Sequence, residues 1–188
     1  MCSALSQSRL GENKLYDKII VSRVAVEMSE PIGFLPGTEE EKMTPWLAAF
    51  TDTLEVLCDM DTTGHTEDKM SDSEATNTTM KYITEKANIQ FKSINYMRGR
   101  NLTRTFAIFD EMQNGSAHQL KTLVTRIGEG SKCVVLGNVG QIDARYLTPK
   151  NCAITYATER FKPFDGSSSM ILEGSVRSKL AAFAEENL

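Results

Sequence analysis

Four short apolar runs, rich in β-branched side chains, constrain the fold of this chain more than any other feature. None of them alternates between polar and apolar positions, so none is typical of a strand with one solvated face. Continuous apolar runs of this length are typical of parallel strands covered on both faces. The runs are Lys18–Ser22, Phe106–Phe109, Cys133–Leu136 and Ser169–Leu172. Together they predict a parallel sheet, and residues 153–157 are a weaker candidate for an edge strand.

Helical patterns lie between and around these runs, which is the order that βα units give. One pattern begins with Thr44 as its cap and Pro45 at its first helical position. Its residues expected to face the core are Leu47, Phe50, Leu54 and Leu57. The sequence therefore predicts an α/β fold.

A second helix is predicted to start at Ser116, because Gln119 stands three residues on, as a capping box requires, and to end at Gly128. Its expected inward residues are Leu120, Leu123, Val124 and Ile127. A last helix is expected after Ser175, and residues 1–10 resemble a helix that ends near Gly11. The expected inward residues of the last helix are Val176, Leu180, Phe183 and Ala184.

The length and composition fit one folded domain over residues 1–188, with a polar loop at about 59–79. A net charge of −4 argues against a wholly basic surface and leaves room only for a local nucleic-acid contact. The sequence has no apolar run long enough to span a bilayer and no leader-like start, so a cytoplasmic protein is expected. Cysteines without C-x-x-C spacing favour free thiols, with Cys133 as a small core residue.

The run Phe106–Phe109 is closed by Asp110 and Glu111, which is the pattern of a Walker B strand. A parallel strand delivers such a pair to the carboxyl edge of the sheet, where open α/β folds bind ligands. There the first acid can hold Mg²⁺ through its water, and the second can polarise the water that attacks a γ-phosphate. The alternative is a strand that ends in a solvated acidic turn.

The longer segment FDEMQNGSAHQLKTLVTRIGEGSKCVVLGNVGQID resembles the PhoH-like family of phosphate-loop ATPases, which is related to superfamily 1 helicases. The resemblance extends upstream to YDKIIVSRVAVEMSEPIGFLPGTEEEKMTPW and YMRGRNL, and downstream to ILEGSVRSKLAAFAEE. It implies a parallel-sheet P-loop NTPase (RecA-like) three-layer core.

The resemblance also implies roles for individual residues. Asp110 would hold Mg²⁺ and Glu111 would be the catalytic carboxylate. Gln141 matches the γ-phosphate sensor of the family's G-D-x-x-Q pattern, with a surface-loop glutamine as the alternative. The other candidates for nucleotide binding are Gln113, Gly137 and Asn138. Asn138 stands where the family carries an acid, so this site has one negative charge fewer.

One arginine is a candidate for the same chemistry, and two others are expected to have structural or relay roles. Arg177 matches a family arginine and is the candidate for neutralising the charge that develops on the phosphate, with a helix-surface arginine as an equal alternative. Arg126 and Arg23 are interpreted as structural or relay residues that tie the sheet edge together.

A turn before the acidic strand carries Tyr96, Arg98, Gly99 and Arg100, which could grip a phosphate backbone and stack one base. The alternative is a loop whose arginines pair with nearby acids.

A Walker A loop requires G-x-x-x-x-G-K-[ST], whose amides wrap the phosphates. Neither Lys92-Ser93 nor Lys121-Thr122 has the required glycines. The resemblance places this loop upstream, so we expect a chain that starts after it, a core without its first strand, and low stability.

Two hypotheses follow. The first is a Mg²⁺-dependent ATPase of phage or bacterial type, acting on RNA or other nucleic acid as a ring-shaped homo-oligomer. The second is a truncated remnant, or a module that binds nucleic acid without hydrolysing ATP.

Overall fold

A computed structural model of the chain describes residues 1–9, 11, 13–24, 50, 52–54, 56, 81–97, 99–172 and 178–187. These residues fall into two compact units, within 1–157 and 158–188. The first unit holds the sheet and the acid pair. The prediction of a single domain stays a prediction.

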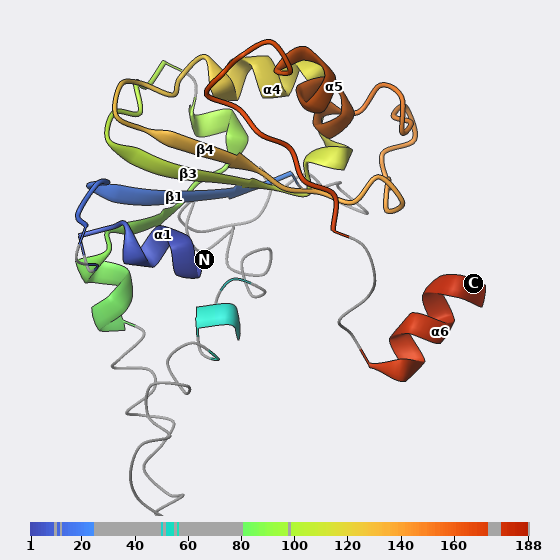
Figure 1. Cartoon of the computed structure of the whole chain (residues 1–188), viewed down its shortest axis with the longest axis horizontal. Helices are drawn as coiled ribbons and strands as arrows, with labels where there is room; N and C mark the ends of the chain where they lie inside the picture. The colour runs from blue at the N-terminus through green and yellow to red at the C-terminus, as the bar shows by residue number, and fades with distance from the viewer. Residues whose placement is uncertain are drawn as a thin grey trace, which may run out of the picture. The chain divides into compact units, whose positions relative to one another are not determined.

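The first unit is built on a four-stranded parallel sheet with the order β2-β1-β3-β4 (Figure 1). The strands are β1 (Lys18–Arg23), β2 (Ile89–Phe91), β3 (Thr105–Asp110) and β4 (Lys132–Val135). Three of the four apolar runs are therefore confirmed as strands. β2 was not predicted, because it is only three residues long and has a glutamine at its centre.

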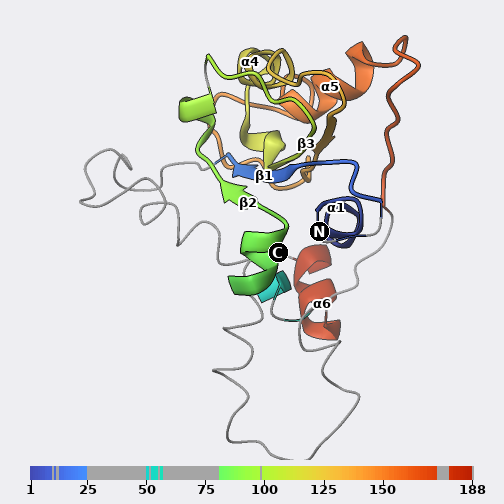
Figure 2. The same ribbon diagram turned by 90° about the vertical axis from the view of Figure 1, so that its left-hand side faces the viewer.

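Helices lie on both faces of the sheet, which confirms the α/β fold. Helix α1 (Cys2–Ser6) lies on one face, and α4 (Ala117–Val124) and the first turns of α5 (Ala153–Arg160) lie on the other (Figures 1 and 2). Short 3-10 helices, η2 (Ile94–Met97) and η3 (Met112–Asn114), flank β3 in sequence. In the part of the chain that the structure describes, no helix is both long enough and apolar enough to cross a membrane.

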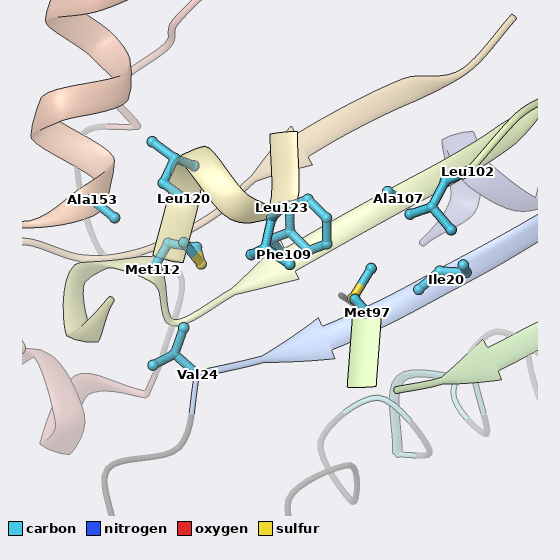
Figure 3. Close-up of a cluster of buried hydrophobic side chains, with 10 residues drawn as sticks. All are labelled: Ile20, Val24, Met97, Leu102, Ala107, Phe109, Met112, Leu120, Leu123 and Ala153. Atoms are coloured by element: carbon cyan, nitrogen blue, oxygen red, sulfur yellow. The ribbon is translucent and has the colours of Figure 1, made fainter. Parts of the chain in front are cut away.

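Each face of the sheet buries its own apolar cluster. On the α4 face, Figure 3 shows Leu123 beside Phe109 of β3. The buried members of this cluster are Ile20, Val24, Met97, Leu102, Ala107, Phe109, Met112, Leu120, Leu123 and Ala153. Those of the opposite cluster are Ala4, Ile19, Val21, Leu54, Ala87, Ile89, Phe106 and Ile108. Because β1 and β3 alternate between the two clusters, both strands are covered on both faces.

The predicted helix caps are confirmed in part. Ser116 and Gln119 form the capping box of α4, and the four expected residues face the core. The helix ends at Val124 rather than at Gly128, and α1 ends at Ser6, before Gly11. A backbone amide of residue 125 bonds back to Lys121 and Leu123, which closes α4 early.

The helix expected after Thr44 lies mostly outside the described residues. Its described positions include 50, 52–54 and 56, which are helical. Leu54 is buried and Phe50 packs against the same cluster, as expected. Thr44, Pro45, Leu47 and Leu57 lie outside the described residues.

Two strand predictions are wrong. Residues 153–157 begin helix α5 instead, because Ala153 and Ala157, four residues apart, both pack on the α4-face cluster. The run Ser169–Leu172 is not a strand, and its side chains from Met170 to Leu172 are 83–88% exposed. An apolar run gives no information on a strand partner, and none among the described residues pairs with this one.

Helix α6 (Lys179–Asn187) forms in the second unit. The prediction that Leu180 and Phe183 face a core is wrong, because they are 77% and 64% exposed. Helical periodicity placed both on one side, but the described residues of this unit are too few to cover that side. Val176 lies outside the described residues.

Candidate functional site

The carboxyl ends of β1, β3 and β4 meet around the acid pair. The amide of Val24 donates to the carbonyl of Asp110 at 3.0 Å, and the amide of Leu136 donates to the carbonyl of Phe109 at 2.8 Å. These bonds carry the strand pairing to the last residue of β3. Glu111 then leaves the strand with φ 55° and ψ 32°, in the left-handed region. A non-glycine residue held there stores strain, which is common at functional sites.

Arg23, the last residue of β1, lies beside both acids. Its Nη2 donates to Glu111 Oε1 at 2.9 Å, and its Nε is 3.8 Å from Asp110 Oδ2. The side chains of Arg23 and Glu111 are each 27% exposed, and that of Asp110 is 23% exposed. The register of the sheet explains this contact, because Arg23 pairs with Asp110 across β1 and β3. The guanidinium is therefore a largely buried counter-charge for the pair.

Gln113 connects the acid pair to the loop that follows β4. Its side chain is buried, and its Nε2 donates to Glu111 Oε2 at 2.6 Å and to the carbonyl of Gln141 at 3.0 Å. Its Oε1 accepts from the amide of Asn138 at 3.2 Å. One amide group thus links Glu111 to both ends of the 138–141 segment. Burial favours a positioning role for Gln113 over direct contact with a nucleotide.

Gly137 is required by this arrangement. A Cβ placed on Gly137 would lie 2.5 Å from Gln113 Oε1 and 3.0 Å from the Gln113 backbone nitrogen. Any other residue would push the loop away from Gln113. The role of Gly137 is therefore close packing of the loop.

Asn114 fixes the next part of the same loop. Its side chain is buried, and its Oδ1 accepts from the amides of Asp143 and Ala144 at 2.8 and 3.3 Å. Asn114 was not predicted from the sequence. The only signal for its role was an amide side chain close after the acids, because its partners lie about thirty positions downstream.

Burial raises the pKa of Asp110 above its ordinary value. The neighbouring Glu111 carboxylate adds to the rise, while the Glu111 backbone amide and the charge of Arg23 oppose it. A bound cation would lower the pKa of Asp110, since it favours the ionised carboxylate.

The residues present fit Mg²⁺ bound through few protein ligands. Among the described residues there is no group of three or more His, Cys, Asp or Glu side chains that could hold a metal. Mg²⁺ in nucleotide sites is commonly held by one or two carboxylates and completed by water and phosphate oxygens. Asp110, partly exposed at the end of its strand, suits that role.

The structure brings six of the predicted site residues together: Asp110, Glu111, Gln113, Gly137, Asn138 and Gln141. The side chain of Asn138 turns back into its own loop, where Oδ1 accepts from the amide of Gly140 at 2.9 Å. Gln141 is exposed, and its role as a phosphate sensor stays a prediction.

The remaining predicted site residues either lie outside the described residues or have no described contact with the acid pair. Arg177 and Arg98 lie outside the described residues. Tyr96 belongs to η2, and Arg100 is exposed next to Gly99, whose φ of 77° makes the predicted turn. Their link to a nucleic acid stays a prediction.

Comparison with known proteins identifies the family of this chain. The PhoH-like protein family matches residues 3–186. This chain belongs to the PhoH-like family. Its parallel α/β fold is consistent with a P-loop NTPase-like PhoH domain.

Individual relatives support the same assignment. The chain is 37% identical over 174 residues to protein PhoH2 of Bacillus subtilis, covering 93% of the chain and 36% of that protein. It is 37% identical over 167 residues to a PhoH-like protein of Bacillus subtilis, covering 88% of the chain and 46% of the relative. Protein PhoH2 of Mycolicibacterium smegmatis is 28% identical over 178 residues, covering 94% of the chain and 37% of the relative. The chain therefore spans less than half the length of these relatives.

Proposed function

We propose that this chain carries the acid-pair side of a Mg²⁺-dependent nucleoside triphosphate site, and that the activity it serves is ATP hydrolysis. The observation that supports this most is the anchoring of Glu111. Arg23 and Gln113 each hold one oxygen of its carboxylate, and the backbone turns left-handed to present it. A carboxylate held at both oxygens at the edge of the sheet is typical of a catalytic acid.

Within this proposal each group has a separate task. Asp110 would hold Mg²⁺, which would supply charge stabilisation at the phosphates. Glu111 orients the attacking water and accepts its proton. The amide of Gln141 contacts the γ-phosphate, and Arg177 neutralises charge that develops during transfer. Gln113 keeps Glu111 and the 138–141 segment in one arrangement.

A nucleic-acid substrate belongs to the same proposal. Arg100 is exposed on the turn after η2, and Tyr96 and Arg98 precede it in sequence. We propose RNA or single-stranded nucleic acid as the partner on which hydrolysis acts, and a ring-shaped homo-oligomer as the working form of the full-length protein.

A second candidate function is a module that binds its partner without hydrolysis. The sequence favours it in one respect, because no G-x-x-x-x-G-K-[ST] motif occurs in these 188 residues. A phosphate loop from elsewhere would be needed for turnover. The two candidates differ in whether Asp110 contributes to nucleotide binding.

The deciding experiment is equilibrium binding of a fluorescent ATP analogue to this chain with Mg²⁺, and with Asp110→Ala. Saturable binding that Asp110→Ala weakens at least about tenfold, or about 1.4 kcal/mol, supports the nucleotide site. Asp17→Ala is the matched control, because Asp17 is also paired with an arginine but at the opposite end of the sheet. Equal binding by all three proteins would argue against the acid-pair site.

A turnover measurement completes the test. In a protein that also supplies the phosphate loop, Glu111→Gln should abolish ATP hydrolysis while nucleotide binding persists. Unchanged turnover would remove Glu111 from its proposed role.

A further inference from the structure

The guanidinium of Arg23 lies against both carboxylates of the acid pair. It is hydrogen-bonded to Glu111 at 2.9 Å but only ion-paired with Asp110, at 3.8 Å. Arg23 therefore makes a close, directional contact with Glu111, the candidate catalytic residue. Its contact with Asp110, the candidate metal ligand, is longer. A cation could reach Asp110 without breaking the bond to Glu111.

Two adjacent carboxylates, each about three-quarters buried, repel one another, and a nearby positive charge offsets this repulsion. Arg23 supplies that charge before any metal binds. The same charge then acts against a cation that approaches Asp110, because like charges a few ångströms apart oppose each other even in a partly solvated site.

Strand pairing does not need Arg23. All six residues of β1 pair with the six residues of β3 through the backbone, and Val24 continues the ladder with its own amide. The side chain of Arg23 thus sits at the end of a pairing that is already complete. A substitution there is expected to leave the sheet intact.

We propose that Arg23 is a built-in counter-cation of the acid pair, which positions Glu111 and weakens divalent-cation binding at Asp110 until a nucleotide brings the metal. This rests on the proposed function, because it takes Asp110 as the metal carboxylate. This role goes beyond tying the sheet edge. Before a nucleotide binds, the charge of Arg23 would oppose the binding of a metal ion at Asp110.

The test uses Mn²⁺ alone as the probe, with free Mn²⁺ followed by its electron paramagnetic resonance signal. Arg23→Met should bind Mn²⁺ about three- to tenfold more tightly than the unaltered chain, the size expected when one nearby positive charge is removed. Arg23→Lys keeps the charge and should stay close to the unaltered chain. A purely structural role predicts weaker or unchanged binding in both variants.

Arg104→Met is the matched control, because Arg104 makes a 2.9 Å bond to Asp17 at the opposite end of the same two strands. It should leave Mn²⁺ affinity unchanged. Circular dichroism melts check that every variant is folded. Should the unaltered chain bind no Mn²⁺, appearance of binding in Arg23→Met supports the proposal, and absence of binding in both overturns it.

The Asp110→Ala variant separates the two levels of inference. If it weakens Mn²⁺ binding while folded Arg23→Met does not tighten it, the counter-cation role is overturned and the metal site stands. If Mn²⁺ binding is unaffected by Asp110→Ala, in the unaltered chain and with Arg23→Met, the metal role of Asp110 fails and the counter-cation proposal fails with it.

Discussion

The two ends of β1 and β3 carry the same contact in different surroundings. At the amino ends, Arg104 Nε lies 2.9 Å from Asp17 Oδ2, and at the carboxyl ends, Arg23 Nη2 lies 2.9 Å from Glu111 Oε1. The first pair is 56% and 43% exposed, whereas both members of the second are 27% exposed. Equal distances therefore conceal unequal electrostatics, since water screens the first pair and only partly reaches the second.

The pKa shifts at the two ends run in opposite directions. A hydrogen bond from Arg104 lowers the pKa of Asp17, whereas burial raises the pKa of Asp110. The surroundings at the amino end stabilise the ionised form of Asp17. Those at the carboxyl end disfavour the ionised form of Asp110. Such opposition is typical of a site built for a ligand rather than for stability.

The largest expected effect comes from the buried amide at the carboxyl end. Gln113→Leu removes three hydrogen bonds, including one to a carboxylate, and should lower the free energy of unfolding by about 2–3 kcal/mol. Urea unfolding measures the change. Gln141→Ala is the control, because Gln113 donates to the backbone carbonyl of Gln141, which this substitution keeps. A loss below about 0.5 kcal/mol for Gln113→Leu would mean that water replaces the amide.

The amino end has a smaller polar connection, made by Ser131. Its hydroxyl accepts from the amide of Thr105 at 2.9 Å and donates to the carbonyl of Leu102 at 2.6 Å. Ser131→Ala should therefore cost about 1–2 kcal/mol of stability, measured as for Gln113. ATP-analogue affinity should not change. A loss of affinity equal to that of Asp110→Ala would show that the two ends are coupled, and would break the comparison.

The sheet was predictable where local pattern suffices. The run Phe106–Phe109 and the two acids after it gave both β3 and the acid pair, because burial and chain direction decide both. The capping box gave the start of α4. By contrast, Ser169–Leu172 has the same apolar character as β3 but is exposed, because a strand also needs a neighbour.

The contacts around the acid pair could not be predicted in the same way. Arg23 reaches Glu111 across 88 positions in sequence, and Gln113 reaches Gln141 across 28. Both contacts depend on strand register and on the left-handed turn at Glu111. Register has no local sequence signal, and a left-handed turn is hard to predict where the residue is not glycine. The sequence thus identified chemical groups, and register determined their partners.

A comparison of two asparagine variants tests the opposite pKa shifts. The folded-state pKa of Asp110 lies above its ordinary value of 3.8, so its ionisation lowers stability as pH rises through and above that value. Asp110→Asn should therefore be more stable than the unaltered chain at pH 7, and the gain should vanish below about pH 3.8, where Asp110 is protonated in both states.

Asp17→Asn should behave with the reverse sign. Its lowered pKa contributes stability that is present above the ordinary value of 3.8 and is lost as pH falls through the folded value. The variant should be slightly less stable at pH 7, by a small amount because the Asp17 side chain is 43% exposed and water screens its ion pairs. Urea titrations at pH 3 and pH 7 check both variants. The same sign for the two differences would refute the contrast between the ends.

The smallest effect is expected at Arg104, where the ion pair and the backbone can be separated. Arg104 has φ 47°, a left-handed conformation like that of Glu111 at the other end of β3. Arg104→Met keeps the strained backbone and loses the pair, so its melting temperature should fall by no more than a few degrees, and added salt should remove the difference. Arg104→Gly also loses the pair but relieves the strain, by about 1 kcal/mol relative to Arg104→Met. Because an exposed ion pair contributes so little, we expect Arg104→Gly to melt at or above the unaltered chain. A glycine variant no more stable than the methionine variant would show that the turn before β3 is unstrained, and would leave Glu111 as the strained residue of the two.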